Sequence, residues 1–280
     1  MNNAISFLCT NDFQFLTSLV QSKSAIVVEE GKKYLIESRL LPLLNELGLE
    51  SLSDLVAQLR KPSASETSQR VVEAMTTNET SFFRDLHPFQ ALQSHILPEL
   101  IKSRAKERSI SIWSNACSSG QEVYSIAMLI RQHFPELSTW KIRLIASDLS
   151  NKILNKAKEG LFNQTEINRG LPMPMLLKYF NRDGLNWRLT DEIRNMVEFR
   201  EVNLIEAWPT AISKMDIVFL RNVLIYFSIE TKAEVIRKVR KALRDDGHLF
   251  LGGAETTMNL KVPFERQVVG KAACYRIKES

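Results

Sequence analysis

The chain has 280 residues, enough for one or two domains at roughly 150 residues per domain. Its 44% hydrophobic and 25% charged residues, with only 10 glycines and 9 prolines, exclude collagen-like, low-complexity and broadly disordered chains. The 37 basic residues exceed the 32 acidic ones by 5, an excess too small to indicate nucleic-acid binding by itself.

Cysteine and histidine usage argues against a metal site or a disulfide framework. The three cysteines, Cys9, Cys117 and Cys274, form no CxxC pair, and the four histidines show no ligand spacing. No basic residue precedes Lys23, so the positively charged start of a signal peptide is missing. No uncharged apolar stretch approaches the roughly 18 residues of a membrane span. We therefore expect a cytoplasmic protein without a metal ion and without membrane insertion.

Residues 1–75 differ from the rest of the chain in pattern and in charge. They carry 7 Lys+Arg against 9 Asp+Glu, whereas residues 76–280 carry 30 against 23. Apolar residues recur at helical spacing, and residues 61–65 break this pattern as a loop or a domain boundary would. We predict a small all-helical domain over residues 1–75 and a second domain over residues 76–280.

From about residue 85, helical stretches alternate with short apolar runs typical of strands. The predicted strands lie around residues 110–113, 142–146, 216–220, 248–251 and 272–277, and the predicted helices around 121–133, 150–159 and 229–244. This alternation indicates an α/β domain with a mostly parallel sheet covered on both faces. Further strand-like pieces at 187–189 and 197–199 predict a small β insertion near residues 186–202.

Open α/β sheets bind ligands at the carboxyl ends of their strands. The first predicted strand runs into residues 115–122, whose small side chains would let backbone N–H groups approach a ligand at the start of a helix. The segment lacks a G-x-G-x-x-G motif, and a tight strand–helix turn explains it equally well. The second strand ends in Asp148, 28 residues after Gly120. The Asp148 carboxylate suits the two hydroxyls of a ribose, with a helix N-cap as the alternative.

Two later strand ends also carry polar residues. Asn203 could read an adenine edge while Leu204 covers the ring, although an ordinary turn explains this segment as well. Arg221, Asn222 and Tyr226 lie within an apolar run, where unpaired polar groups would be costly. Asn222 and Tyr226 are therefore candidate site residues.

The four strand ends, in this order, resemble the class I S-adenosylmethionine methyltransferase fold. Residues 75–84, MTTNETSFFR, also resemble the T-x-N-x-T-x-F-F-R signature of the chemotaxis receptor (protein-glutamate) O-methyltransferases of the CheR type. Residues 220–227, LRNVLIYF, are similar to that family's C-R-N-V-x-I-Y-F. The resemblance covers essentially the whole chain. It implies a Rossmann-like doubly wound sheet, a small all-helical N-terminal domain and a small antiparallel β insertion.

The resemblance implies an enzyme that transfers methyl from S-adenosylmethionine to glutamate carboxylates of chemoreceptors. The products would be glutamate methyl esters, which serve sensory adaptation in chemotaxis, and S-adenosylhomocysteine. By resemblance, the cofactor contacts would be Asn78, Thr80 and Arg84 at the methionine end, Glu122 at the amino group, Asp148 at the ribose, Asn203 and Leu204 at the adenine, and Asn222 and Val223 near the methionyl group. An arginine at the methionine end is chemically sensible, because a guanidinium pairs bidentately with a carboxylate.

The chain departs from the family pattern in two places. The family's G-E-E-P-Y-S is GQEVYS here, so Gln121 replaces the first glutamate while the second acid, Glu122, is kept. Leu220 stands where the family has the cysteine before Arg221. Because the second acid is kept, cofactor binding is still expected.

We predict that Tyr226 lies near the transferring methyl group and orients the incoming carboxylate. Arg221 would either help Tyr226 or pair with a structural acid. The implied partner is the cytoplasmic helical region of chemoreceptors, which Lys32, Lys33 and Arg39 could contact, unless they form a solvated helix face. Whether the β insertion binds a receptor C-terminal peptide stays open, and a monomer is the default expectation.

Two other functions are compatible with this sequence. A nucleic-acid or small-molecule methyltransferase on the same fold would use the basic run Lys102, Arg104, Lys106 and Arg108. Such runs are usually solvated helix faces, and no stacking aromatic residues are interleaved with this one. A non-catalytic module would instead bind the cofactor or a receptor tail. The intact motifs favour the enzyme, and no nucleic-acid partner is predicted.

Overall fold

The computed structural model describes residues 8–278. The chain divides into two compact units. One unit holds the residues up to Thr77 together with Tyr226–Ser228, and the other holds residues 78–225 and those from Ile229 onward.

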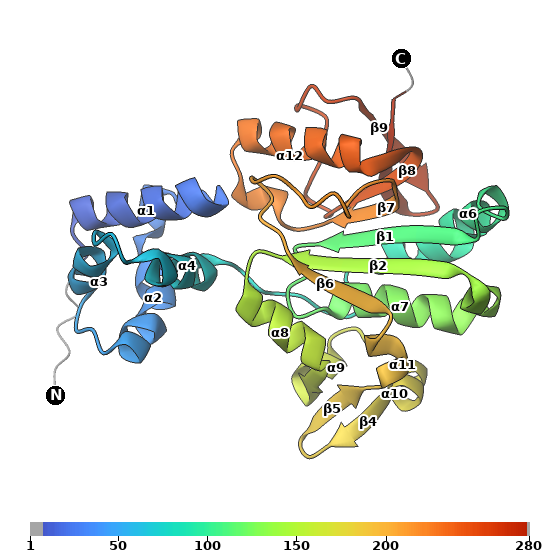
Figure 1. The fold of residues 1–280 in the computed structure, drawn as a ribbon, viewed down its shortest axis with the longest axis horizontal. Coiled ribbons are helices and arrows are strands. Elements are labelled where there is room, and N and C mark those ends of the chain that lie inside the picture. The colour runs from blue at the N-terminus through green and yellow to red at the C-terminus, as the bar shows by residue number, and fades with distance from the viewer. Residues whose placement is uncertain (1–7, 279–280) are drawn as a thin grey trace. The chain divides into compact units, whose positions relative to one another are not determined.

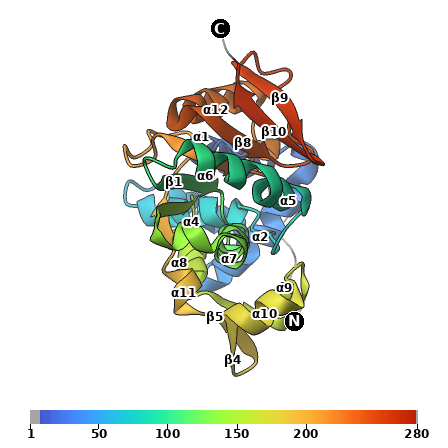
Figure 2. The same cartoon turned by 90° about the vertical axis from the view of Figure 1, so that its right-hand side faces the viewer.

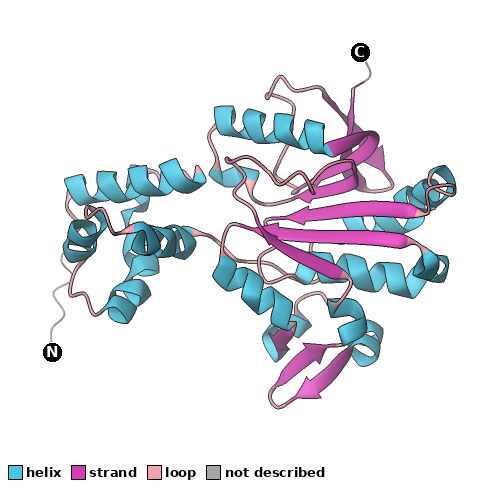
Figure 3. Cartoon of the chain, viewed as in Figure 1, coloured by secondary structure: helices cyan, strands magenta, loops and turns pink. Residues whose placement is uncertain are grey.

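The described part of the first unit is helical, as Figure 3 shows by colour. Its helices are α1 (Thr10–Ser24), α2 (Lys33–Leu47), α3 (Leu52–Leu59) and α4 (Ser65–Met75), with a 3-10 turn at Glu30–Lys32. The break at residues 61–65 therefore lies between two helices of one unit. Leu16, Ile36, Leu40 and Leu55 are fully buried and form the centre of its core. Burying such side chains contributes roughly 1.5–3 kcal/mol each.

The basic residues considered as receptor contacts have partners inside this unit. Lys32 pairs with Glu29 at 3.0 Å, and the Lys33 ammonium lies 5.3 Å from the centre of the Phe13 ring. Arg39 donates a hydrogen bond to the Thr77 hydroxyl and another to the Met75 carbonyl. These contacts orient the three side chains, so the predicted surface is not a row of unpaired charges.

The second unit is built on a seven-stranded sheet in the order β6-β2-β1-β7-β8-β10-β9. The strands are β1 (Ser109–Asn115), β2 (Lys141–Asp148), β6 (Val197–Glu201), β7 (Met215–Leu220), β8 (Leu243–Leu251), β9 (Phe264–Val269) and β10 (Ala272–Ile277). Neighbours from β6 to β8 are parallel, and β10 is antiparallel to β8 and β9. The predicted Rossmann-like, mostly parallel sheet is confirmed, whereas β9 was not predicted.

Helices connect and cover these strands (Figure 1). They are α5 (His87–Ala91), α6 (Leu97–Ser103), α7 (Gln121–His133), α8 (Asn151–Glu159) and α12 (Ile229–Ala242), with a π turn at Leu92–Ile96 and a 3-10 turn at Pro135–Thr139. The α7 and α8 helices pack against β2 and β6, while α5 packs against β10 and α12 against β8. Within residues 8–278, no helix combines the length and apolarity that crossing a bilayer requires.

The small β insertion differs from its predicted bounds. Its antiparallel strands are β3 (Leu161–Asn163), β4 (Phe180–Asp183) and β5 (Asn186–Leu189), in the order β3-β5-β4. It also carries α9 (Gln164–Asn168), α10 (Met173–Tyr179) and α11 (Asp191–Arg194). Both Figure 1 and Figure 2 show β4 and β5 projecting at the lower edge of this unit.

The prediction that residues 197–199 belong to this insertion is wrong. They lie in β6, which runs parallel to β2 in the large sheet with Phe199 opposite Ala146. A short half-buried strand has the same alternating pattern in either sheet, so the pattern cannot say which sheet it joins.

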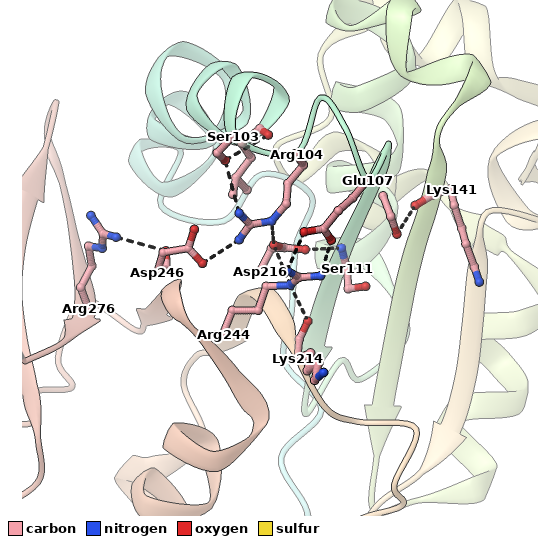
Figure 4. Close-up of polar contacts among 12 residues, drawn as sticks. Ser103, Arg104, Glu107, Ser111, Lys141, Lys214, Asp216, Arg244, Asp246 and Arg276 are labelled. Carbon is pink, nitrogen blue, oxygen red and sulfur yellow. Dashed lines mark hydrogen bonds and ion pairs between the residues drawn. The ribbon is translucent and has the colours of Figure 1, made fainter.

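A buried ionic network holds the amino ends of three strands and the end of α6 (Figure 4). Arg104 donates to Asp216 at 2.8 Å and to Asp246 at 2.6 Å. The other oxygen of Asp216 accepts the Ser111 N–H at 2.8 Å, and Arg244 approaches the same carboxylate at 3.4 Å. The sequence had suggested that the basic run of residues 102–108 forms a solvated helix face. Arg104 does not fit that interpretation, because its side chain is buried in this network. The hydrogen bond from Arg104 lowers the pKa of Asp246.

We expect Asp216→Ala to destabilise the protein by about 3–5 kcal/mol, because it removes the buried carboxylate that binds both Arg104 and the Ser111 N–H. Urea denaturation of the purified protein measures this. Asp245→Ala is the matched control, because that side chain is 92% exposed and its pair with Arg240 contributes about 1 kcal/mol or less. Equal stability of the two variants would contradict a structural role for the network.

Candidate active site

The four predicted strand ends meet at one edge of the sheet. Strands β6, β2, β1 and β7 are consecutive neighbours and all run parallel. In the register, Asn115 lies opposite Ser147 and Leu220, and Asp148 lies opposite Glu201. The strands therefore end at the same level, and the segments that follow them share one site at the carboxyl edge.

The turn between β1 and α7 is tight for a steric reason. Ala116, Ser118 and Gly120 have φ values of 51°, 51° and 92°, which are left-handed conformations. A Cβ on Gly120 would lie 3.0 Å from the Tyr124 ring, so a larger residue does not fit. Gly120 is the N-cap residue of α7 and has no side chain to bond the N–H groups of the first turn. Those N–H groups therefore lie at the carboxyl edge of the sheet, where a ligand could accept from them.

Asp148 is fixed beside this turn and is largely buried. One carboxylate oxygen accepts the Ser118 N–H at 2.9 Å, and the other accepts the Ser150 N–H at 3.1 Å. The N-cap of α8 is Ser150, whose hydroxyl accepts the Ile153 N–H. The N-cap alternative for Asp148 is therefore wrong, since its neighbour performs that task.

Arg221 joins the two signature motifs in the interior. Its guanidinium donates to Glu122 at 2.8 Å, to the Arg84 carbonyl at 2.9 Å and to Asp85 at 2.6 Å. The other oxygen of Glu122 accepts the Ser114 hydroxyl at 2.8 Å. Because the Arg221 side chain is only 2% exposed, these contacts match pairing with a structural acid, the second of the two roles considered for it.

The turn lies in a negative electrostatic environment. Burial raises the pKa of the Cys117 thiol well above its ordinary value, and the charges of Asp148 and Glu122 raise it further. The thiol is therefore neutral, and the two carboxylates supply negative charge near it. Such a field favours a cationic ligand.

The loop that carries the first motif is anchored to the same turn. The Asn78 carbonyl accepts the Ser118 hydroxyl at 2.9 Å, and the Phe83 N–H donates to the Ser125 hydroxyl at 3.0 Å. Arg84 donates to the carbonyl of a residue in its own loop, at 3.0 Å. Ser118 thus links the Asn78 backbone to Asp148, and Arg221 links the Arg84 backbone to Glu122.

The small β insertion supports this loop from behind. Phe82 packs edge-to-face on Phe162 and Phe180, with ring centroids 5.0 Å and 5.8 Å away. A Cβ on Gly170 would lie 2.1 Å from the Phe82 carbonyl oxygen, so only glycine allows this close approach. Sequence reasoning missed these contacts, because nothing in the pattern relates Phe82 to residues 80 to 100 positions later.

The segment after β6 is held by a lysine that sequence reasoning also missed. The Lys238 ammonium of α12 donates to the carbonyls of Leu204 at 3.1 Å and Ile205 at 2.8 Å. The Asn203 amide donates to Glu206 at 3.0 Å and accepts the Ile205 N–H at 3.3 Å. Asn203 is half-buried and Leu204 is buried. This burial is compatible with the predicted adenine contacts, in which Asn203 bonds the edge of the ring and Leu204 packs on its face.

The second motif continues past β7 into a 3-10 turn at Leu224–Tyr226. Asn222 has a φ of 59°, a left-handed conformation that asparagine tolerates better than most residues, and Val223 is half-buried. Tyr226 is grouped with the helical unit, in which its carbonyl accepts the Val27 N–H at 3.0 Å. Tyr226 is half-buried and directly follows the segment after β7, and its role beside the methyl group stays a prediction.

These residues fit S-adenosylmethionine on the grounds of their own chemistry. Asp148 would offer a carboxylate to the positive charge of the cofactor, as would Glu122 beside its pair with Arg221, and the turn would admit close backbone contact. In addition, the Asn115 amide nitrogen at the end of β1 is buried without a hydrogen-bond partner among residues 8–278. A buried donor of this kind is costly unless a ligand or water satisfies it.

The sheet order and the acids at its carboxyl edge define a class I S-adenosylmethionine-dependent methyltransferase. Residues 78–271 match the CheR methyltransferase SAM-binding domain, and residues 11–76 match the CheR methyltransferase all-alpha domain. The chain therefore belongs to the CheR methyltransferase family, and its cofactor is S-adenosylmethionine.

Characterised relatives agree with this assignment. The chain is 38% identical to chemotaxis protein methyltransferase 1 of Pseudomonas aeruginosa and 36% identical to chemotaxis protein methyltransferase Cher2 of Pseudomonas putida. Each match covers 95% of this chain and 98% of the relative. Among solved structures, a TehB-like SAM-dependent methyltransferase from Corynebacterium glutamicum is similar with a TM-score of 0.39 and 13% identity, over 78% of this chain and 100% of that one. That likeness is too distant to bear on the site.

We expect Asp148→Ala to weaken cofactor binding by about 10- to 100-fold, because it removes a charged hydrogen-bond acceptor. Calorimetric titration with S-adenosylhomocysteine measures this, and circular dichroism checks the fold. Asp183→Ala is the control, since that carboxylate pairs with Arg188 in the small sheet. Unchanged affinity in folded Asp148→Ala protein would remove this residue from the site.

Proposed function

We propose that this enzyme transfers the methyl group of S-adenosylmethionine to glutamate side chains of chemoreceptors, forming methyl esters for sensory adaptation. The observation that carries the proposal is the set of contacts of Arg221, in the second signature motif, whose guanidinium donates to the Arg84 carbonyl of the first motif and to Glu122 at the carboxyl edge of the sheet. The chemotaxis methyltransferases named above support the choice of substrate.

In this proposal the cofactor lies along the edge from β6 to β7. Its adenine meets Asn203 and Leu204, its ribose Asp148, its amino group Glu122, its methionine end Asn78, Thr80 and Arg84, and its methionyl group Asn222 and Val223. The sheet order supports this assignment, because it places the segments after β6, β2, β1 and β7 side by side in that sequence.

The reaction needs little acid–base catalysis. The reference pKa of glutamate is about 4.3, so the substrate carboxylate is already an ionised nucleophile at neutral pH. When bound, the cofactor supplies a methyl group on a sulfonium and a neutral thioether leaving group. The protein's task is to align the two reactants at about 3 Å and to exclude water. Alignment of this kind contributes roughly 7–11 kcal/mol.

Two residues act on this alignment. Tyr226 orients the incoming carboxylate through its hydroxyl. Arg221 acts through Glu122 and through the loop that ends at Arg84, because its guanidinium already contacts both. We therefore assign Tyr226 a direct role and Arg221 a positioning role.

The proposed partner is the cytoplasmic helical region of a chemoreceptor, so the proposal includes a cytoplasmic enzyme, and a monomer is its default oligomeric state. The three cysteines, which are all free, suit that compartment. The small β insertion presents exposed Leu177 and Leu185, and we assign to it the receptor's C-terminal peptide.

The decisive experiment supplies the purified enzyme with radiolabelled S-adenosylmethionine and membranes that contain the organism's own chemoreceptors. We expect label on receptor bands that mild base releases as methanol, because carboxyl esters hydrolyse whereas N-methyl groups do not. Membranes without receptors are the control. Absence of transfer by an enzyme that binds the cofactor would contradict the proposal.

We expect Tyr226→Phe to lower kcat by at least about 10-fold while cofactor affinity stays unchanged, because only the orienting hydroxyl is lost. Steady-state kinetics on receptor membranes measure this. Tyr179→Phe is the matched control: its hydroxyl bonds to Gln132, at the far end of α7 from the site. Full turnover with unchanged KM in Tyr226→Phe would exclude the assigned role.

A further inference from the structure

The turn after β8 contains a buried carboxylate that the sequence motifs do not include. Glu255 is only 9% exposed. One of its oxygens accepts the N–H of Asn222 at 2.8 Å and the N–H of Gly252 at 2.7 Å. The other accepts the N–H of Ile225 at 3.3 Å. A single side chain thus binds three backbone donors from two strand-end segments.

Glu255 is itself held in place. Its N–H donates to the Gly252 carbonyl at 2.9 Å, and its carbonyl accepts the Tyr275 hydroxyl of β10 at 3.4 Å. Within residues 8–278 no basic group forms an ion pair with its carboxylate. A buried carboxylate without a cation is costly, and its backbone donors are what stabilise the charge. Burying this carboxylate therefore costs folding free energy that an apolar side chain at the same position would not cost.

The carboxylate determines the geometry of the second motif. Asn222 lies just past the end of β7 in a left-handed conformation, and Glu255 provides the acceptor for its N–H. Gly252 packs so close that an added Cβ would lie 2.7 Å from the Asn222 amide nitrogen and 2.9 Å from its backbone nitrogen. The turn after β8 therefore fixes the backbone conformation of residues 221–225 through hydrogen bonds and close packing.

We infer that Glu255 is a positioning residue for methyl transfer. By fixing the backbone of Asn222 and Ile225, it sets the conformation of the segment that carries Asn222 and Val223, the proposed floor of the cofactor site. This inference rests on the proposed roles of Asn222 and Tyr226, and it deepens them by naming the group that holds their segment. Glu255 touches neither reactant.

The test compares Glu255→Gln with Glu265→Gln, which alters an exposed carboxylate on β9 whose contact is with Gln267. In Glu255→Gln, either orientation of the new amide places its NH₂ group against a backbone N–H. We expect amide hydrogen exchange at residues 222–225 to accelerate at least about 10-fold, with β7 and α12 unchanged. We also expect S-adenosylhomocysteine to bind about 10-fold more weakly by calorimetry.

The kinetic signature separates positioning from simple loss of stability. In Glu255→Gln, kcat for receptor methylation should fall about 10- to 100-fold, while the KM for receptor stays within about twofold. Gly252→Ala would place a Cβ 2.7 Å from both the Asn222 amide nitrogen and the Glu255 carboxylate oxygen, so it should break the same contact and produce the same local exchange and the same affinity loss. Glu265→Gln should match the wild type in all measurements.

Two results would overturn the inference. One is wild-type exchange at Asn222 in folded Glu255→Gln; the other is a cofactor-product affinity within twofold of the wild type. If Glu255→Gln does not fold, amide hydrogen exchange of the wild-type protein replaces this test. The inference then requires the Asn222 amide to exchange at least about 10-fold more slowly than the same amide in an unstructured peptide. The exchange and binding measurements need no receptor, so a wild-type enzyme that fails to methylate receptors would reject the proposed function and leave this test intact.

Discussion

The buried guanidinium of Arg221 is the constraint on which the site depends. A charged arginine in the interior is tolerated only when acids and acceptors surround it, and the two terminal nitrogens of Arg221 bind Glu122, Asp85 and the Arg84 carbonyl. Glu122 lies in the first turn of α7, Arg84 ends the first motif and Arg221 is the second residue of the second motif. One charge therefore requires three segments, far apart in sequence, to meet at one point. The cofactor residues are carried on those segments, so their arrangement follows from this contact.

The two ends of the sheet have different tasks. At the amino ends, Asp216 and Arg104 form a buried network that holds strands and helix together. At the carboxyl ends, the backbone takes unfavourable conformations at Phe83, Ser118 and Asn222, and carboxylates gather there. Strained backbone persists only where the surroundings determine it, as Glu255 does for Asn222. Left-handed residues lie at both ends, at Arg108 and Lys214 as well as at Ser118 and Asn222, so the two ends differ in the groups that gather there rather than in backbone strain.

Several parts of this arrangement could be predicted from sequence because they depend on local pattern. Apolar runs rich in β-branched residues predicted the strands around 110–113 and 142–146. Asp148 was a candidate site residue because it lies at the end of the second of these runs. The two motifs are continuous in sequence, so the family and its cofactor could be inferred before the fold was known. In contrast, β6 was assigned to the wrong sheet, since alternation carries no information about the neighbouring strand.

The sequence by itself determined the class of fold, the family, and which residues are candidates for the cofactor site. Only the tertiary structure decided that Arg221 is engaged by Glu122, that Ser150 caps α8, and that Lys238 and Glu255 hold the segments after β6 and β7. The physical reason is range. Helix and strand periodicity and motif spacing are properties of neighbouring residues, whereas a buried charge chooses its partner from residues that the folded chain brings close.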